Sequence, residues 1–145
     1  MPVILFIFMV INLSTSSTYV ASYKIQKEIK SKIQQYISTN NIDKDTMSII
    51  VSVEPSSVHG EAPVFMADWD LVWYLRLMLD SKTLKAYPIY VNPKIDDVGF
   101  NSLSSNTSLP YKDLYYYDYN LDKITPVNNK NELKTLANKY FQANQ

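Results

Sequence analysis

The 145-residue chain is predicted to be a small α/β domain that follows an N-terminal membrane or signal helix. Three features of the sequence indicate this class. Residues 1–23 carry no charged side chain, residues 46–92 have the pattern strand, helix, strand, and the C-terminal residues have the period of an amphipathic helix. We expect residues 1–23 to form a membrane anchor or signal segment. Residues 24–145 should form a sheet of three to four strands with a βαβ crossover and a C-terminal helix.

The composition argues against several classes of protein. Fourteen basic side chains balance 14 acidic ones, whereas a nucleic-acid partner needs an electropositive surface. The chain has no cysteine and a single histidine, His59, so neither a thiolate nor a multi-histidine metal site can form. With only Gly60 and Gly99, it has no glycine-rich phosphate loop. We therefore expect no cofactor, no metal and no nucleic-acid partner.

The N-terminal segment contains the apolar run "PVILFIFMVI" and continues uncharged through "NLSTSSTYVA". Residues 3–23 have about the 20 residues that a bilayer core requires, with Tyr19 and Tyr23 at the interface. Two alternatives also fit. The segment is a signal peptide cleaved near Ser22, or residues 3–11 are the central strand of a soluble protein.

The next segment, "YKIQKEIKSKIQQYI", is predicted to be an amphipathic helix that packs its isoleucines on the domain. These isoleucines recur every four residues, at Ile25, Ile29, Ile33 and Ile37. Glu28 and Lys32 have the spacing of a helical ion pair. The lysines are Lys24, Lys27, Lys30 and Lys32. By the positive-inside tendency they favour a cytoplasmic domain, and a contact with lipid headgroups is a second interpretation.

The centre of the chain is predicted to be a crossover unit with parallel strands at 46–54 and 84–92. Between them, Asp68 is the expected N-cap of the helix "WDLVWYLRLML", with Asp70 in its first turn. We expect this helix to be mostly buried, on a face formed by Leu71, Leu75, Met78 and Leu79 and widened by Val72 and Trp73. Pro88 places the second strand at a sheet edge or a bulge.

The C-terminal part is predicted to begin with a polar, serine-rich loop over residues 93–113. A hairpin should follow in "LYYYDYNLDKITPV", turning at residues 120–122, with alternate tyrosines facing core and solvent. The final helix has Asn129 or Asn131 as its cap. Its inner face should comprise Leu133, Leu136, Ala137 and Tyr140.

The order of these segments resembles a known arrangement. An apolar span, a helix ending "IQQYISTNN", the strand "SIIVSV", the helix "ADWDLVWYL" and the strand "LKAYPIYV" are similar to the extracytoplasmic C-terminal tail domain of polytopic lipid-linked-sugar glycosyltransferases, the protein-mannosyltransferase-like group. The similarity covers residues 3–92, and its motifs have low specificity. It implies an extracytoplasmic domain, whereas the lysines of residues 24–32 favour a cytoplasmic one. In that family the catalytic carboxylates lie between early spans, so the resemblance assigns no catalytic residue to this chain.

A first candidate binding site is the loop after the first strand, because open α/β sheets bind ligands beyond the C-terminal ends of their strands. The loop "EPSSVHGEAP" carries Ser56, Ser57, His59 and Glu61. A serine and a histidine together suggest nucleophilic chemistry. The same loop also fits a solvated connection, since no oxyanion site or G-x-S-x-G elbow is recognisable.

A second candidate is the start of the central helix. Asp68 and Asp70 could serve acid–base work, or act only as a cap and a dipole partner. Trp69 and Trp73 could form a platform for a sugar or lipid, or pack in the core. Core packing predicts a loss of about 3–5 kcal/mol on replacing either tryptophan by alanine. Residues 106–108 form a glycosylation sequon.

Taken together, these features predict a membrane-tethered, non-catalytic accessory or recognition domain, a detached tail of a membrane glycosyltransferase if the resemblance holds. Its partners would be the lipid bilayer through residues 3–23 and a membrane protein or lipid-linked sugar. We expect it at a membrane. The resemblance predicts an extracytoplasmic domain, whereas the lysines favour a cytoplasmic one. The alternatives are a small secreted binding or effector protein and a soluble intracellular α/β protein.

Overall fold

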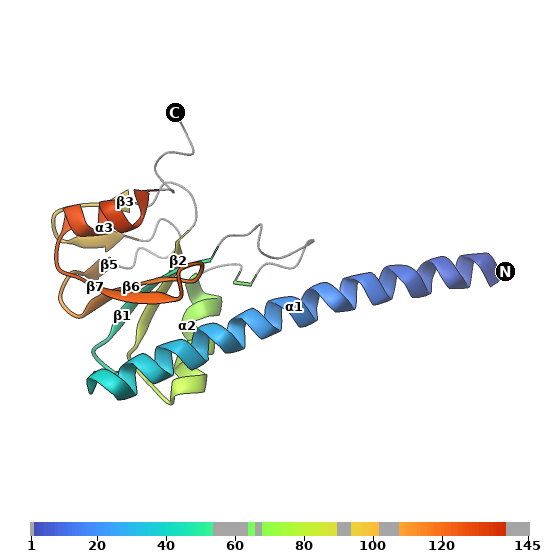
Figure 1. The fold of residues 1–145 in the computed structure, drawn as a ribbon, viewed down its shortest axis with the longest axis horizontal. Helices are drawn as coiled ribbons and strands as arrows, with labels where there is room; N and C mark the ends of the chain where they lie inside the picture. Colours follow the sequence, from blue (N-terminus) through green and yellow to red (C-terminus); the bar gives the residue numbers. More distant parts are fainter. Residues whose placement is uncertain (1, 54–63, 66–67, 90–93, 102–107, 139–145) are drawn as a thin grey trace.

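The computed structural model describes residues 2–53, 64–65, 68–89, 94–101 and 108–138, except for the side chains of residues 2–18 and Asp68. The fold is α/β, with a mixed four-stranded sheet and a smaller antiparallel sheet (Figure 1). Helices lie on both faces of the larger sheet (Figure 1). This confirms the predicted fold class at that level.

The first helix, α1, runs without a break over Pro2–Asn40, and its N-terminal half projects away from the sheets (Figure 1). The prediction that residues 3–11 form a central strand is therefore wrong. The helix ends where Asn41 takes a left-handed conformation and the Ile42 amide donates to the Ile37 carbonyl at 3.1 Å. At 1.5 Å per residue, 39 residues extend about 58 Å.

The anchor predicted over residues 3–23 falls mostly on residues 2–18, whose side chains lie outside the described part. Among the residues that the structure describes, no helix is both long and apolar enough for a membrane crossing.

The larger sheet has the order β2-β1-β6-β7. Its strands are β1 (Ser48–Ser52), β2 (Lys85–Ile89), β6 (Leu114–Asp118) and β7 (Lys123–Val127). β1 pairs in parallel with both β2 and β6, and β6 pairs antiparallel with β7. The helix α2 (Asp68–Leu79) connects β1 to β2, so the predicted crossover is confirmed. Pro88 lies on an edge strand, as predicted.

Residues 94–110 correct a second prediction. In place of a loop, the described residues form the small sheet β3 (Lys94–Ile95), β4 (Gly99–Asn101) and β5 (Ser108–Pro110). The Asp96 carboxylate accepts hydrogen bonds from the Val98 and Gly99 amides and from Asn101, which fixes the β3–β4 turn. A Cβ at Gly99 would lie 2.2 Å from the Leu109 carbonyl oxygen, so the close approach of β5 requires glycine there.

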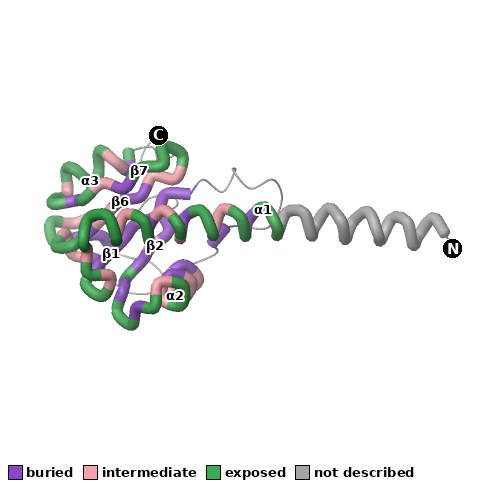
Figure 2. The backbone as a smooth tube through the Cα atoms, turned by 60° about the horizontal axis from the view of Figure 1, so that its bottom comes forward, coloured by how far each residue is buried: buried purple, intermediate pink, exposed green. Residues whose placement is uncertain are grey.

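Two apolar cores lie on opposite faces of the larger sheet. On one face, Ile49 and Val51 of β1 pack against Ile29 and Ile33 of α1 and against α2. On the other, Ile50 packs against the small sheet and the third helix, α3 (Lys130–Leu136). Successive β1 residues thus face different cores, as strand geometry requires. Figure 2 shows buried segments concentrated in the strands. α1 and α2 lie on one side of the sheet and α3 on the other (Figure 1).

The two cores explain the tyrosines of β6. Tyr117 faces the core under α1 and α2, and Tyr116 faces the core under α3. The prediction that alternate rings face solvent is wrong for this pair, because both faces of the sheet are covered and both rings are 1% exposed.

Candidate functional site

The predicted site residues fall into two groups. Ser56, Ser57, His59 and Glu61 lie outside the described residues, as does the sequon asparagine at position 106. The second group lies at the start of α2, which begins at Asp68 itself, one residue earlier than predicted. The side chain of Asp68 is not described, and Asp70 is half-buried.

The tryptophans of α2 correct a fourth prediction. Trp69 and Trp73 are 63% and 66% exposed, and Leu77, one turn further, is 76% exposed. The buried face of α2 carries Leu71 and Leu75 instead. The helix is therefore half buried rather than mostly buried, because one face packs on the sheet while its outer face carries the two indoles.

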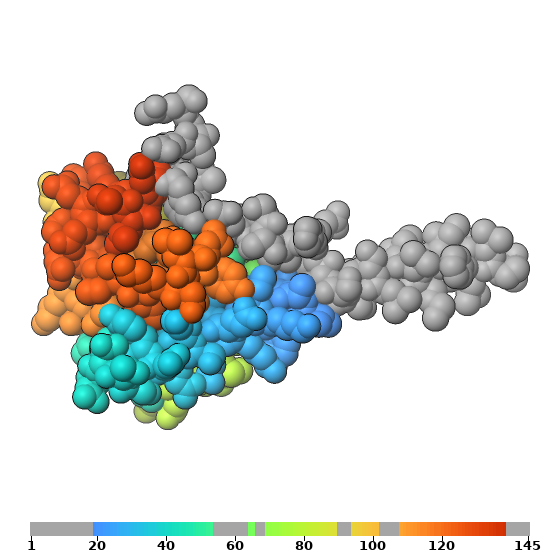
Figure 3. All heavy atoms as spheres, in the orientation of Figure 1, coloured from blue at the N-terminus to red at the C-terminus, as the bar shows by residue number. Residues whose placement is uncertain are grey.

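Open α/β sheets bind ligands beyond the C-terminal ends of their parallel strands. In this sheet, the described part of that edge lies at the turn between β6 and β7. Because β1 and β6 are parallel, their C-terminal ends meet there, and the Tyr119 amide donates to the Ser52 carbonyl at 3.1 Å. An open pocket of about 570 Å³ lies between this turn and α1, and we call it the α1–hairpin pocket. Its lining is Glu28, Ser31, Lys32, Gln35, Tyr117, Tyr119, Asn120 and Asp122. Figure 3 shows α1 directly against the β6–β7 hairpin.

Polar and charged side chains of α1 and the β6–β7 hairpin contact each other at this pocket. Lys32 donates to Asp122 at 2.6 Å, and the Tyr119 hydroxyl donates to Glu28 at 2.6 Å. The Tyr117 hydroxyl donates to the other oxygen of Asp122 at 3.2 Å. The predicted pair of Glu28 with Lys32 is therefore replaced by two contacts to the hairpin. Sequence spacing could not show this, because the partners are about 90 residues away.

The tyrosines of the pocket stay protonated far into the alkaline range. Burial raises the pKa of Tyr119 to about 12, and its hydrogen bond to the Glu28 carboxylate adds to the increase. Burial also raises the pKa of Tyr117 well above its usual range, with a further contribution from the negative charge of Asp122. Neither hydroxyl is a ready base at neutral pH. Both act as hydrogen-bond donors: Tyr119 joins the hairpin to Glu28 of α1, and Tyr117 donates to Asp122 within the hairpin.

The remaining polar side chains of the pocket are those that could bind a ligand. Ser31, Gln35 and Asn120 line it, while Glu28, Lys32 and Asp122 are each engaged by a protein partner. A hydroxyl and two amides offer donors and acceptors without net charge. This arrangement suits the binding of a small polar molecule better than acid–base chemistry.

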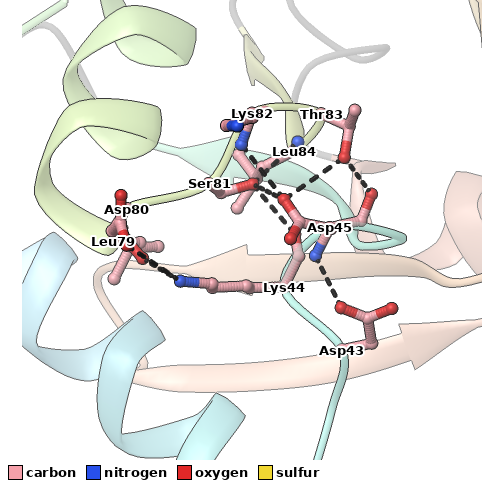
Figure 4. A network of polar contacts seen from close by, with 9 residues as sticks. All are labelled: Asp43, Lys44, Asp45, Leu79, Asp80, Ser81, Lys82, Thr83 and Leu84. Carbon is pink, nitrogen blue, oxygen red and sulfur yellow. Dashed lines mark hydrogen bonds and ion pairs between the residues drawn. The ribbon is translucent and has the colours of Figure 1, made fainter.

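A second polar cluster surrounds Asp45 and has a structural role (Figure 4). Its carboxylate accepts hydrogen bonds from the Ser81 hydroxyl at 2.7 Å, the Lys82 amide at 3.0 Å and the Thr83 hydroxyl at 3.3 Å. These hydrogen bonds lower the pKa of Asp45, and the bond from Ser81 makes the largest contribution. The cluster joins the segment before β1 to the turn before β2, at the N-terminal ends of the parallel strands. That end is opposite to the edge where α/β sheets bind ligands.

Comparison with known proteins identifies no relative: no family model, no curated protein and no solved structure matches the chain. The candidate site is therefore assigned from geometry and chemistry alone.

Proposed function

We propose that this chain is a membrane-tethered, non-catalytic recognition domain. The observation that carries the proposal is the continuity of α1, which joins the charge-free N-terminal run to the core in a single helix. Ile29 and Ile33 of α1 are fully buried against the sheet. A helix held in this way transmits its orientation to the domain, so an anchor in residues 3–23 would fix the domain close to the bilayer.

The α1–hairpin pocket provides the recognition site in this proposal. Its uncharged donors and acceptors favour a polar ligand rather than an ion. The resemblance over residues 3–92 suggests a membrane glycosyltransferase as the context, with a membrane protein or a lipid-linked sugar as the partner. That context has the resemblance as its only support.

A secreted protein released by cleavage near Ser22 is less well supported. Ser22 is 4% exposed and lies within the continuous helix α1. Proteases prefer exposed loops and termini. Cleavage there would also have to occur before the helix packs against the domain.

The tether is tested by alkaline carbonate extraction of membranes from cells that express the full chain. We expect the chain to remain in the membrane pellet at its full intact mass. Introducing Val10→Lys and Leu13→Lys, near the middle of residues 3–23, should release it, because each lysine at the centre of a span costs about 2.5–3.5 kcal/mol.

The matched control is a pair of lysines on exposed positions of the domain half of α1, Gln34→Lys and Ser38→Lys, which should leave extraction unchanged. Full extraction of the unmodified chain at its intact mass would refute the tether. A mature N-terminus near Tyr23 would support the secreted alternative instead.

A further inference from the structure

The outer face of α2 is an apolar surface that the core does not use. Trp69, Trp73 and Leu77 recur every four residues, so they form one stripe along the helix. All three are more than 60% exposed. Exposed apolar stripes of this kind mark an interaction surface rather than ordinary solvent exposure. The chain has only two tryptophans, and both lie here.

The helix α2 lies beside α1. The two helices are in contact, they share one core, and they lie on the same side of the sheet (Figure 1). Burial raises the pKa of Tyr74 of α2, and the neighbouring Tyr23 of α1 adds to the increase, so these two side chains are close. Tyr23 is itself 53% exposed and is the last residue of the charge-free segment. The helix α2, at Tyr74 next to Trp73 in the chain, therefore adjoins the end of the proposed anchor.

Positive charge lies next to these rings. Lys24 is exposed, and the Lys27 ammonium lies 4.7 Å from the centre of the Tyr23 ring. In the part of the chain that the structure describes, neither lysine forms an ion pair. At 1.5 Å per residue, they lie about 1.5 and 6 Å beyond Tyr23 along the helix. Those distances fall within a headgroup layer of roughly 5–7 Å.

We propose that Tyr23, Lys24 and Lys27 of α1 and Trp69, Trp73 and Leu77 of α2 form one surface that rests on an anionic lipid bilayer. We call it the aromatic–basic surface, and its role depends on the tether of the proposed function. Tryptophan and tyrosine are favoured at the membrane interface, where the ring is apolar and its polar atom is hydrated. Lysines close to the surface gain from anionic headgroups. The continuity with the anchor and the unpaired charges favour a lipid surface over a protein partner.

The two native tryptophans provide the experiment. The full chain is reconstituted in vesicles of phosphatidylcholine with a minority of phosphatidylglycerol, with or without bromine on the acyl chains. Contact with the bilayer predicts that brominated lipid quenches the tryptophan emission. It also predicts weaker quenching for the double variant Lys24→Gln/Lys27→Gln. Raising the salt from about 0.1 M to about 1 M should weaken quenching too, because the screening length falls from about 10 Å to about 3 Å.

The control moves the reporter to the opposite side of the sheet. The variant Trp69→Phe/Trp73→Phe/Lys134→Trp places the only indole on the exposed side of α3, and its emission should not be quenched. Lys134→Gln is the matched charge control and should leave quenching of the native tryptophans unchanged.

The outcomes separate the two proposals. Loss of the chain from the vesicles after carbonate treatment would refute the tether. Retention of the chain with unquenched native tryptophans would refute only the aromatic–basic surface. In that case, self-association that depends on Trp73 would assign the stripe to contact with a second copy of the chain.

Discussion

At the residue scale, the helix α2 places side chains of similar hydrophobicity in opposite environments. Leu71 and Leu75 are fully buried, whereas Trp73 and Leu77 are mostly exposed. The helical period separates them, since residues four apart share a face and residues two apart do not. The one charged side chain beyond the first turn, Arg76, donates from Nε to the Leu84 carbonyl at 2.8 Å. Hydrophobicity alone therefore does not identify the buried face of this helix.

This difference predicts unequal losses of stability. Trp73→Ala should lower the free energy of unfolding by about 1 kcal/mol at most, since most of its ring stays in water in the folded state. Leu75→Ala should cost about 2–5 kcal/mol, because it leaves a cavity in the core. Urea unfolding followed by circular dichroism measures both. Equal losses in the two variants would contradict the exposed position of Trp73.

At the element scale, local backbone and side-chain contacts fix the end of α2 and the start of α3. α2 ends with Asp80 in a left-handed conformation and the Ser81 amide donating to the Arg76 carbonyl at 3.0 Å. α3 begins at the cap Asn129, whose side chain accepts from the amides of Asn131 and Glu132 at 3.0 Å. Of the two cap candidates in the sequence, the structure selects Asn129 because only its backbone is extended immediately before the helix.

The cap gives a prediction with a built-in control. Asn129→Ala should lower the free energy of unfolding by about 1 kcal/mol, since two amides of the first turn lose their acceptor. Asn131→Ala should change it little, because that side chain is exposed within the helix. Thermal unfolding of the two variants decides this. A larger loss for Asn131→Ala than for Asn129→Ala would contradict the assignment of Asn129 as the cap.

At the scale of the whole molecule, α1 is held on the sheet by buried isoleucines and by two polar contacts to the β6–β7 turn. Lys32 with Asp122 and Tyr119 with Glu28 join segments about 90 residues apart. Gln26 also donates from its side chain to the Val64 carbonyl. These long-range contacts are what make a rigid unit of the helix and the domain, and the proposed tether depends on that rigidity.

These contacts predict an alkaline limit to stability. Because the pKa of Tyr119 is about 12 in the folded chain and about 10 in an unfolded one, its contribution is present below about pH 10 and is lost as the pH rises through about 12. Denaturant midpoints of the full chain should therefore fall over this interval. Tyr119→Phe should show a shallower fall, and the difference between the two curves isolates the contribution of Tyr119. Parallel curves would contradict the raised pKa.

The local patterns of the sequence were enough to predict a helix at 69–79, the crossover strands, the hairpin and the isoleucine stripe. They also limited the cap of α3 to two asparagines, Asn129 and Asn131. Each depends on residues close together in the chain, whose spacing or turn chemistry selects one local conformation. The sequence also contains the charge-free N-terminal run, and the interpretation of that run as a tether is still a proposal.

Only the tertiary structure decided which surfaces are covered. The β3–β5 sheet and α3 cover the second face of the larger sheet, and this places Tyr116 and Tyr117 in two different cores. The parallel pairing of β1 with β6 brings the β6–β7 turn against α1 and replaces the expected Glu28–Lys32 pair with two contacts to that turn. The tryptophans are exposed for the same reason. The burial of a side chain depends on which distant segment packs against it, and the periodicity of the helix does not specify that segment.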